Sequence, residues 1–493
     1  MGQSSNLIQQ RINKLQEIRE VGIDPYPYNF TVDHQSAEAI EKYDDKQEFA
    51  EKEFPVKMAG RIMSMRGHGK VGFVHIQDST GRIQLYIRRD KLGEEDFDNI
   101  YKRLDIGDII GVEGWIFRTR TGELTVHVEK LTLLTKSLRP LPEKWHGLKD
   151  VETRYRQRYV DLIVNTEVKK VFLSRTKIIQ SIRAFLDNRG FVEVDTPVLQ
   201  PIYGGATARP FVTRHNALEM DLYLRIADEL YLKRLIVGGI DRVYEIGKDF
   251  RNEGMDRDHN PEFTMLELYQ AYSDYEDIMQ LTEEMISSVT EKLHGTTKIT
   301  YQGEEIDLSP PWRRLPMLDG IKDALGADIK DMSREDMLKL ASEHHIELDE
   351  GISRGKIIER FFEEFVEVNL TQPTFITDYP IEISPFAKKK RDDETLTERF
   401  EIFIGKLEIG NAFSELNDPI DQRERFIDQV RQKEAGDEEA HVMDDDFLRA
   451  LEYGMPPTGG LGIGIGRLVM LLTDMPSLRD VILFPQMRPE EGL

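Results

Sequence analysis

The sequence of 493 residues contains no cysteine. Disulfide bonds, thiolate zinc sites, iron–sulfur clusters and cysteine nucleophiles are therefore excluded. No stretch approaches the roughly 18 apolar residues of a membrane-spanning helix. Residues 1–6 lack the charged and then apolar pattern of a signal peptide, and Asn6 stands where a myristoylation motif needs Ser or Thr. These absences lead us to expect a soluble protein of the cytoplasm with no membrane partner.

Several motifs of nucleotide-binding and metal-binding proteins are absent as well. There is no GxxxxGK[ST] phosphate-binding loop, and residues 462–467 contain GxG without the third glycine of a dinucleotide-binding fold. Glu343, His344 and His345 are adjacent and do not form the HExxH pattern of zinc proteases. Any site that binds phosphate must therefore be built in another way.

Charge is distributed unevenly along the chain. The net charge of −24 argues against a polyanionic partner for the protein as a whole. Residues 54–140, however, carry 15 Lys and Arg against 11 Asp and Glu. Because binding to nucleic acid needs local positive charge, this mildly basic segment remains a candidate for such a contact.

The same segment alternates apolar and polar residues with a period of two, which predicts β-strands. One helix, near residues 94–104, is expected after the third strand. Five strands with a helix in this position are typical of an OB-fold barrel, and another small β-barrel is the alternative. The expected strands cover residues 56–62, 72–78, 82–87, 109–117 and 124–134.

Length and composition predict the remaining organisation. At about 100–200 residues per domain, the chain holds two to four domains. Pro140 and Pro142 stop regular structure and indicate a linker. We expect an N-terminal helical extension (1–53), an OB-fold domain (54–140), a linker (141–149) and one large α+β domain (150–493).

Residues 459–470 give the strongest local signal in the large domain. Glycines recur at every second position from Gly460 to Gly466, which leaves one face of a strand without side chains. A bare face indicates that a ligand or another backbone comes close, and ATP is our candidate; a tight strand-to-helix junction is the alternative. Arg467 and an apolar helical run follow directly.

A long-looped hairpin is predicted over residues 242–272. In its second strand, Phe263, Met265, Glu267 and Tyr269 share one face. Arg251 ends the first strand, and its planar guanidinium suits a phosphate or carboxylate. An ordinary surface hairpin is the alternative. Upstream, residues 176–190 predict a helix that Gly190 ends, and residues 191–197 predict a strand.

Taken in chain order, these three segments resemble motifs 1, 2 and 3 of class II aminoacyl-tRNA synthetases. A preceding OB-fold is similar to the subgroup that charges lysine, aspartate and asparagine. The resemblance covers nearly the whole chain and implies an antiparallel catalytic sheet with flanking helices. The segments that look most like bacterial-type lysyl-tRNA synthetases are residues 144–148, 251–254, 259–264 and 413–418.

The resemblance implies an ATP-dependent ligase that forms an aminoacyl-adenylate and passes the acyl group to tRNA(Lys). It also implies a homodimer, through motif 1. Arg251 would hold the α-phosphate and the substrate carboxylate, and Arg467 the γ-phosphate; both are the implied catalytic residues. The other residues implied at ATP are Glu253, His259, Asn260 and Phe263, the last stacking on adenine.

A magnesium site and a lysine pocket are also implied. Glu401 and Glu408 match metal-binding glutamates of the family, and Mg²⁺ prefers carboxylate oxygens as ligands. The spacing of the two residues alone indicates ordinary strand carboxylates. A buried lysine ammonium needs carboxylate partners, and Glu229 and Glu415 match the family's pair. An enzyme that activates aspartate would instead need a cation in the pocket, to pair with the side-chain carboxylate of its substrate. The other residues implied in the pocket are Gly205, Glu267, Tyr269 and Asn411.

For the barrel, the resemblance implies binding of the anticodon. Single-stranded bases stack on aromatic rings and pair their edges with polar side chains. Arg66, Phe73 and Gln84 match the positions that hold the central uridine. Since Phe73 lies in an alternating strand, a place in the barrel core is the alternative for it.

One position departs from the family pattern. Gly466 stands where an acidic residue usually precedes the motif 3 arginine, so either the strand has another bare position or Arg467 is oriented differently. Three other functions stay open: an aspartate or asparagine ligase, a non-catalytic or protein-modifying relative, and a non-catalytic single-strand nucleic-acid binder. The last would leave residues 150–493 without a role.

Overall fold

The computed structural model describes residues 2–46, 48–142, 148–349, 351–434 and 440–490. The chain divides into two compact units, residues 1–149 and 150–493, and each has its own hydrophobic core. Residues 143–147 of the expected linker lie outside the described residues. Within the described ranges, no helix is long and apolar enough to cross a membrane.

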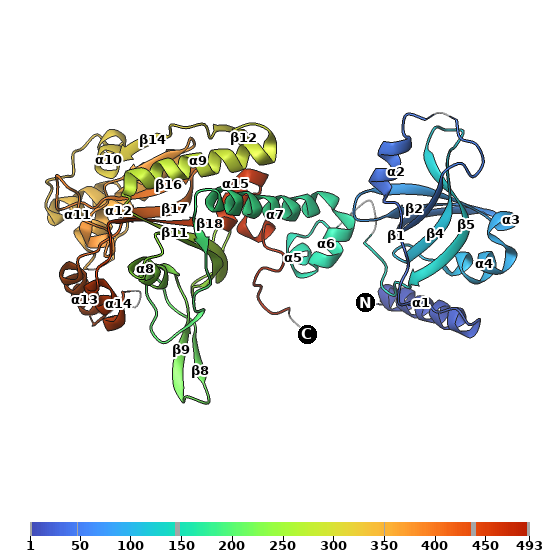
Figure 1. The fold of residues 1–493 in the computed structure, drawn as a ribbon, viewed down its shortest axis with the longest axis horizontal. Coiled ribbons are helices and arrows are strands. Elements are labelled where there is room, and N and C mark those ends of the chain that lie inside the picture. Colours follow the sequence, from blue (N-terminus) through green and yellow to red (C-terminus); the bar gives the residue numbers. More distant parts are fainter. Residues whose placement is uncertain (1, 47, 143–147, 350, 435–439, 491–493) are drawn as a thin grey trace. The chain divides into compact units, whose positions relative to one another are not determined.

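The first unit contains a closed barrel of five strands in the order β1-β2-β3-β5-β4 (Figure 1). Side chains that alternate toward the interior, such as Met58, Val74 and Val126, are fully buried. This topology confirms the OB-fold prediction. The strands are β1 (Pro55–His68), β2 (Val71–Gln77), β3 (Arg82–Arg88), β4 (Ile109–Arg118) and β5 (Leu124–Thr135).

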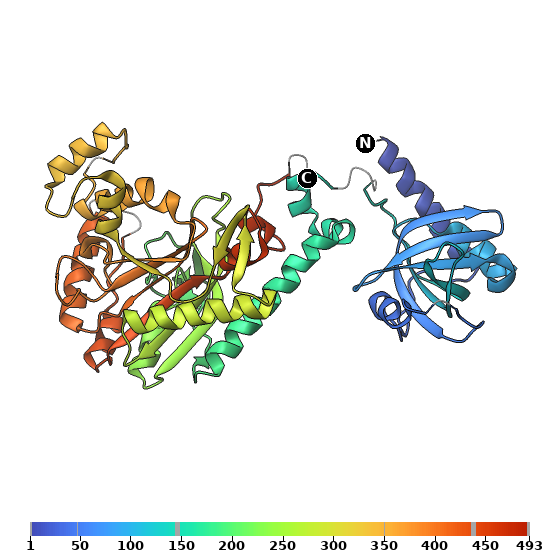
Figure 2. The same ribbon diagram turned by 90° about the horizontal axis from the view of Figure 1, so that it is seen from above.

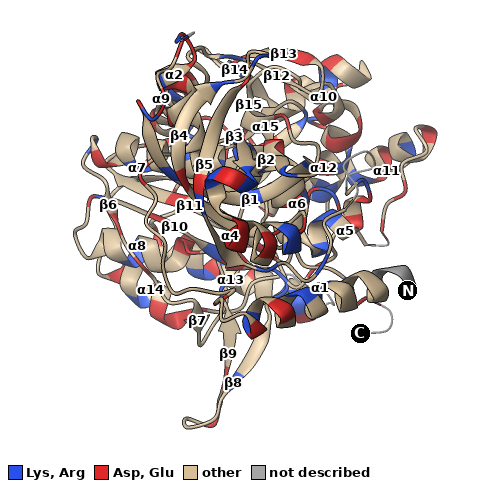
Figure 3. Ribbon diagram, turned by 90° about the vertical axis from the view of Figure 1, so that its right-hand side faces the viewer, with Lys and Arg blue, Asp and Glu red and all other residues tan. Residues whose placement is uncertain are grey.

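Four helices belong to the same unit as the barrel, and buried residues of all four join its core. The helix expected after the third strand begins as predicted but ends earlier, at Asn99, and a 3-10 turn (Tyr101–Arg103) follows it. Its first turn is acidic, as the red segments of α4 in Figure 3 show, and negative charge is favourable at a helix N-terminus. The helices are α1 (Gly2–Glu20), α2 (Ser36–Tyr43), α3 (Arg89–Leu92) and α4 (Glu94–Asn99).

The second unit is built on an eight-stranded sheet in the order β14-β15-β16-β17-β18-β11-β10-β6. Its pairs are antiparallel except β14 with β15 and β10 with β6. The strands are β6 (Val192–Glu193), β10 (Arg242–Phe250), β11 (Glu262–Ala271), β14 (Arg313–Pro316), β15 (Thr374–Thr377), β16 (Arg399–Ile404), β17 (Leu407–Ser414) and β18 (Thr458–Gly464).

One face of this sheet is covered by three helices, α7 (Thr166–Asp187), α9 (Tyr275–His294) and α15 (Ile465–Thr473). Figure 2 shows α7 and α9 running side by side along the sheet. Leu266 and Leu268 of β11 point to this face and join the same core as the helices. Since side chains alternate along a strand, Met265, Glu267 and Tyr269 must point to the opposite face.

The other elements surround that opposite face or extend from the sheet. The helices are α5 (Val151–Arg156), α6 (Arg158–Val164), α8 (Glu229–Val237), α10 (Met317–Leu325), α11 (Arg334–Glu343), α12 (Arg354–Phe365), α13 (Pro419–Glu434) and α14 (Asp445–Glu452). Two small sheets are formed by β7 (Leu199–Gln200), β8 (Val212–His215) and β9 (Met220–Leu224), and by β12 (Lys298–Tyr301) and β13 (Glu304–Asp307).

The strand expected over residues 191–197 is much shorter than predicted. Only Val192 and Glu193 form the β6 ladder with β10. Further along, the Glu245 carboxylate accepts hydrogen bonds from the backbone N–H and hydroxyl of Thr196, at 3.0 and 2.7 Å. A side chain therefore takes the place of the strand partner, and the ladder ends early.

Candidate active site

A cavity of about 620 Å³ lies on the sheet face opposite α7 and α9. Every residue that the sequence assigns to ATP, to the amino acid or to magnesium lines it. These residues come from β11, β16, β17, α8 and α15 and from loops. Convergence of distant segments on one cavity supports the assignments as a set, while the role of each residue remains a proposal.

The glycine face of β18 forms part of the cavity floor, and Gly460 has the closest neighbours. A Cβ there would lie 1.9 Å from Oε1 of Glu415 and 2.6 Å from the Tyr269 ring. Close approach to this backbone was expected, with ATP as the candidate. At Gly460 the expectation of ATP is wrong, because protein side chains already occupy the adjoining space.

Gly466 lies in a helix and not in the glycine strand. β18 ends at Gly464, and α15 begins at Ile465. A Cβ at Gly466 would lie 2.4 Å from Cδ1 of the buried Leu478, so packing beneath the helix explains the glycine. The prediction of one more bare strand position is therefore wrong.

Arg467, in the first turn of α15, is held by another residue of the cavity. Its Nη1 donates to the backbone oxygen and to Oε2 of Glu408, both at 2.9 Å. Its Nη2 lies 3.5 Å from Nε2 of His259. The orientation of Arg467 thus comes from β17 and does not need an acidic neighbour at position 466.

The hairpin of β10 and β11 presents an arginine over an aromatic ring. Arg251 follows β10 directly, and its guanidinium carbon lies 5.0 Å from the centroid of the Phe263 ring. The backbone N–H of Arg251 donates to the oxygen of Pro261 at 2.9 Å, which closes the loop between the strands. A flat cation and a flat ring therefore share one side of the cavity.

The other residues expected at ATP lie in the hairpin loop, and they differ in how exposed they are. Glu253 and His259 are exposed, and Nδ1 of His259 lies 2.9 Å from the Asp256 carboxylate. Asn260 is buried, its amide donates to the oxygen of Glu262 at 2.6 Å, and its Oδ1 accepts from the N–H of Gln486 at 3.3 Å. In this structure the Asn260 side chain therefore holds the loop in place.

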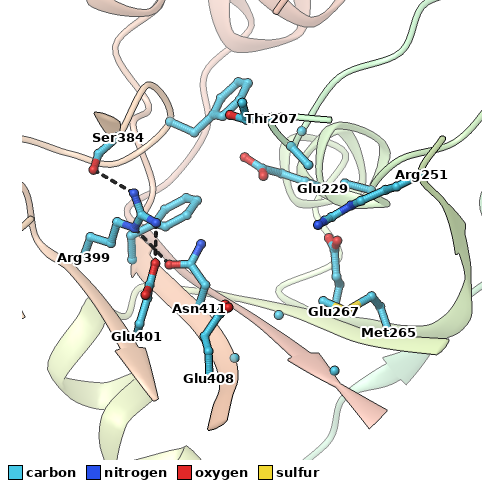
Figure 4. A pocket seen from close by; sticks show the side chains of 18 of the residues that line it. Thr207, Glu229, Arg251, Met265, Glu267, Ser384, Arg399, Glu401, Glu408 and Asn411 are labelled. Atoms are coloured by element: carbon cyan, nitrogen blue, oxygen red, sulfur yellow. Dashed lines mark hydrogen bonds and ion pairs between the residues drawn. The ribbon is translucent and has the colours of Figure 1, made fainter. Parts of the chain in front are cut away.

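Glu401 and Glu408 line the cavity from neighbouring strands (Figure 4). Burial raises the pKa of Glu401 to about 7. Repulsion from Glu408 and Glu359 adds to this shift, and attraction by Arg399 opposes it. Burial, with repulsion from nearby carboxylates, also raises the pKa of Glu367 to about 7. Both carboxyl groups therefore hold a proton more readily than an exposed glutamate does.

The donor set fits a hard cation such as Mg²⁺, which prefers carboxylate oxygens. Among the described residues, no group of three or more His, Asp or Glu is arranged to hold a metal ion. Glu401 and Glu408 would thus supply two protein ligands, and substrate phosphates the others, as is common for Mg²⁺.

The two carboxylates expected to bind an ammonium lie together. Glu229 at the start of α8 and Glu415 after β17 are 5% and 1% exposed. Between them stands Nζ of Lys233, at 2.5 Å from Oε1 of Glu229 and in contact with Oε2 of Glu415. Burial raises the pKa of both carboxyl groups, while Lys233 opposes that shift.

The remaining residues of the expected lysine pocket lie beside this pair. Glu267 accepts hydrogen bonds from the Tyr269 hydroxyl at 3.1 Å and from the N–H of Asp228 at 3.2 Å. Burial, with repulsion from Asp249 and Glu229, raises the pKa of Glu267 to about 8. The hydroxyl of Tyr269, which the resemblance implies in the lysine pocket, is thus directed to Glu267 in this structure.

Gly205 of the same pocket has a positive φ of 90°. A Cβ at this position would lie 3.0 Å from Cβ of Ala227 and 3.1 Å from Cβ of Glu229. Glycine is therefore required here both by the backbone conformation and by the space next to Glu229.

Two residues of the site were missed by the sequence reasoning. Arg399 donates to Glu401 at 2.6 Å and to Asn411 at 3.1 Å (Figure 4), and Lys233 bridges the acidic pair. The spacing of each from a predicted site residue could have indicated it. Arg399 stands two residues before Glu401 and therefore on the same strand face, and Lys233 stands four residues after Glu229 and therefore on the same helix face.

On the barrel, two of the three predicted residues, Arg66 and Phe73, are exposed, whereas Gln84 is buried. Arg66 is the register partner of Phe73 in β1 and β2, and Phe73 is the partner of Tyr86 in β3. Phe73 is 37% exposed, and its ring centroid lies 4.9 Å from that of Tyr86. The alternative that Phe73 belongs to the core is therefore wrong.

Gln84 forms a hydrogen bond with Glu123, a residue that the sequence did not indicate. Its Nε2 donates to Oε2 of Glu123 at 2.7 Å, and its Oε1 accepts from the hydroxyl of Thr125 at 2.9 Å. His75 lies 2.9 Å from the other oxygen of Glu123. The face thus combines aromatic rings with a polar cluster, the two features that bind unstacked bases.

Comparison with known proteins agrees with both units. The family described as tRNA synthetases class II (D, K and N) matches residues 150–488, and the OB-fold nucleic acid binding domain matches residues 56–134. The chain is 60% identical over 490 residues to the lysine–tRNA ligase of Pelotomaculum thermopropionicum, covering 99% of this chain and 96% of the relative.

Two further relatives carry the same name. The chain is 58% identical over 488 residues to the lysine–tRNA ligase of Moorella thermoacetica, with 99% of each chain covered. It is 58% identical over 490 residues to that of Syntrophomonas wolfei, covering 99% and 98%. The chain therefore belongs to the lysine–tRNA ligase family within the class II tRNA synthetases.

Proposed function

We propose that this protein activates L-lysine with ATP, forming lysyl-adenylate and pyrophosphate, and then transfers lysine to the 3′ end of tRNA(Lys). The observation that carries the proposal is the buried pair Glu229 and Glu415 in the wall of a cavity that also holds Arg251 and Arg467. A buried ammonium needs such carboxylates, and ATP phosphates need such arginines.

The first step needs no general base, because the lysine carboxylate is already a nucleophile. Its oxygen attacks the α-phosphorus of ATP, and pyrophosphate leaves. Arg251 binds the α-phosphate and the carboxylate and brings them together, and Arg467 binds the γ-phosphate. Phe263 stacks on adenine. The rate gain then comes from positioning and from neutralising phosphate charge.

Glu401 and Glu408 would hold Mg²⁺, which when bound supplies positive charge at the phosphates. In the structure, Glu408 orients Arg467, and Arg399 pairs with Glu401. On the amino-acid side, Glu267 binds the α-amino group beside Gly205, and Asn411 completes the wall of the pocket.

The proposal extends to the partners. The barrel face of Arg66, Phe73 and Gln84 binds the anticodon of tRNA(Lys). The motif 1 segment pairs with a second copy of the chain, a proposal supported by Leu173 of α7 and Val192 of β6, which are 55% and 49% exposed in the single chain. The proposed substrates place the reaction in the cytoplasm.

The test is pyrophosphate–ATP exchange measured with each of the twenty amino acids in turn. We expect exchange with lysine and little with any other. Exchange that depended on aspartate or asparagine would assign the chain to another branch of the family. Absence of exchange with every amino acid, in a folded protein that binds RNA, would favour a non-catalytic binder.

A further inference from the structure

The two carboxylates proposed to bind the substrate ammonium already hold an ammonium of the protein itself. Lys233 is fully buried, and its Nζ contacts one oxygen of Glu229 and one of Glu415. The centroids of the Phe386, Phe413 and Tyr269 rings lie 5.1, 5.3 and 5.9 Å from this nitrogen. Since a buried cation is costly unless it is paired, this arrangement explains how Lys233 stays charged.

Lys233 binds the carboxylates from behind. Glu229 and Glu415 both line the cavity, whereas Lys233 does not. Lys233 contacts Oε1 of Glu229 and Oε2 of Glu415. The other oxygens face glycines of the cavity wall: Oε2 of Glu229 would lie 3.7 Å from a Cβ on Gly205, and Oε1 of Glu415 would lie 1.9 Å from a Cβ on Gly460. Each carboxylate therefore keeps one oxygen that Lys233 does not contact and that lies beside a glycine of the cavity wall, and Oε1 of Glu415 is buried there without a hydrogen-bond partner.

The two carboxylates and Lys233 together carry a net charge of −1 when all three are ionised, which one further cation would neutralise. Glu229 and Glu415 bring two negative charges and Lys233 one positive charge. A second ammonium, entering from the cavity, would complete the neutralisation. Without Lys233, two adjacent buried carboxylates would repel one another, and one of them would take up a proton. It would then offer a hydroxyl where the substrate needs an acceptor.

We propose that Lys233 is a positioning and specificity-determining residue, which keeps both carboxylates ionised and aims one oxygen of each at the ammonium of a single substrate lysine. The inference rests on the proposed function. It also explains why a cation in the pocket does not favour aspartate as the substrate, since that cation is already paired with two carboxylates.

The first experiment compares Lys233→Met with a matched control on the same helix. Arg234→Met removes the same charge from the neighbouring residue, whose guanidinium pairs with Asp444 at 2.9 Å. In lysine-dependent pyrophosphate exchange, we expect Lys233→Met to raise the KM for lysine at least 30-fold and to change the KM for ATP less than threefold. Arg234→Met should change neither KM more than threefold.

Norleucine separates positioning from packing, because it has the four-carbon side chain of lysine without the terminal ammonium. If Lys233 acts through the charged pair, Lys233→Met should weaken lysine binding and leave inhibition by norleucine within threefold of its original strength. Equal weakening of lysine and norleucine would mean that Lys233 only supports packing, and the inference would be overturned.

A second experiment needs no variant and so does not depend on the folding of Lys233→Met. A crystal structure of the unaltered protein with bound L-lysine should keep Nζ of Lys233 between Glu229 and Glu415, with the substrate ammonium on their other oxygens. If the substrate ammonium takes the position of Nζ and Lys233 swings away, Lys233 is only a displaceable placeholder and the inference is wrong. Failure of the unaltered protein to use lysine would instead refute the proposed function.

Discussion

Glu415 is the single residue on which lysine binding should depend most. It is buried beside Gly460 and shares Lys233 with Glu229. Glu415→Gln leaves a buried cation without one of its partners, which costs roughly 3–5 kcal/mol. We expect the KM for lysine in pyrophosphate exchange to rise by two orders of magnitude or more, while the KM for ATP changes little. Unchanged kinetics with lysine would remove Glu415 from the site.

Glu267 should make lysine binding dependent on pH. Burial and neighbouring carboxylates raise its pKa to about 8, so at pH 7 it is mainly protonated in the free protein. Only the ionised form pairs with the α-ammonium of lysine, and binding must therefore release a proton. Lysine affinity should rise as the pH increases from 6 to 8.

Calorimetric titration with lysine in buffers of different ionisation enthalpy measures this release directly. We expect about one proton released at pH 7 and none in Glu267→Gln, which should also bind lysine more weakly. A binding enthalpy that did not depend on the buffer would show that Glu267 is not the group that pairs with the amino acid.

The two carboxylates proposed for magnesium should differ in their effects. Glu401→Ala removes a metal ligand, and a high Mg²⁺ concentration should restore part of the lost exchange activity. Glu408→Ala also frees Arg467, whose Nη1 it holds through Oε2, so we expect a larger loss and weaker rescue. Exchange rates measured over a range of Mg²⁺ concentrations decide this. Full activity of both variants at low Mg²⁺ would refute the metal assignment.

At the scale of elements, the bare face of β18 leaves space for Tyr269 of β11 and for Glu415, which directly follows β17. Gly460→Ala would bring a methyl group to 1.9 Å from Glu415 and 2.6 Å from Tyr269, so one of them must move. Gly464→Ala on the same strand is the matched control, because its nearest neighbours lie at 3.7 Å or beyond, an ordinary contact.

We expect Gly460→Ala to raise the KM for lysine at least tenfold and to spare the KM for ATP, and Gly464→Ala to leave the KM for lysine nearly unchanged. Thermal unfolding of both variants checks that the sheet is intact. Similar kinetics for the two variants would mean that the bare face at Gly460 has no part in shaping the amino-acid pocket.

At the scale of the whole molecule, the two compact units should carry separable functions, because each has its own core. Phe73→Ala removes an exposed ring from the barrel face. Stacking on such a ring contributes about 1–3 kcal/mol per base. We expect charging of tRNA(Lys) to require more tRNA, by about tenfold or more, while lysine-dependent exchange keeps its rate.

Tyr28→Ala is the control for this variant, since Tyr28 is a fully exposed aromatic residue of the same unit outside the barrel strands. It should change neither reaction. A parallel loss of charging and exchange in Phe73→Ala would indicate a structural role for Phe73 and would count against separate functions of the two units.

The sequence alone determined the periodic features of this protein. Alternation over residues 54–135 predicted the five barrel strands, and alternation after residue 262 placed Phe263, Met265, Glu267 and Tyr269 on one face. Such patterns can be read locally because a strand repeats every two residues and a helix every 3.6. The motif order was sufficient to indicate the family, which the comparisons then showed.

Only the tertiary structure decided which groups meet in the cavity. Lys233 lies between Glu229 of its own helix and Glu415, which follows the distant strand β17, and no local pattern could predict that three-way contact. Gly466 continues the two-residue period of the glycines, but it belongs to α15, where it packs against the distant Leu478. Periodicity fixes the direction of a side chain within its element, whereas its partners depend on long-range packing that the local sequence does not encode.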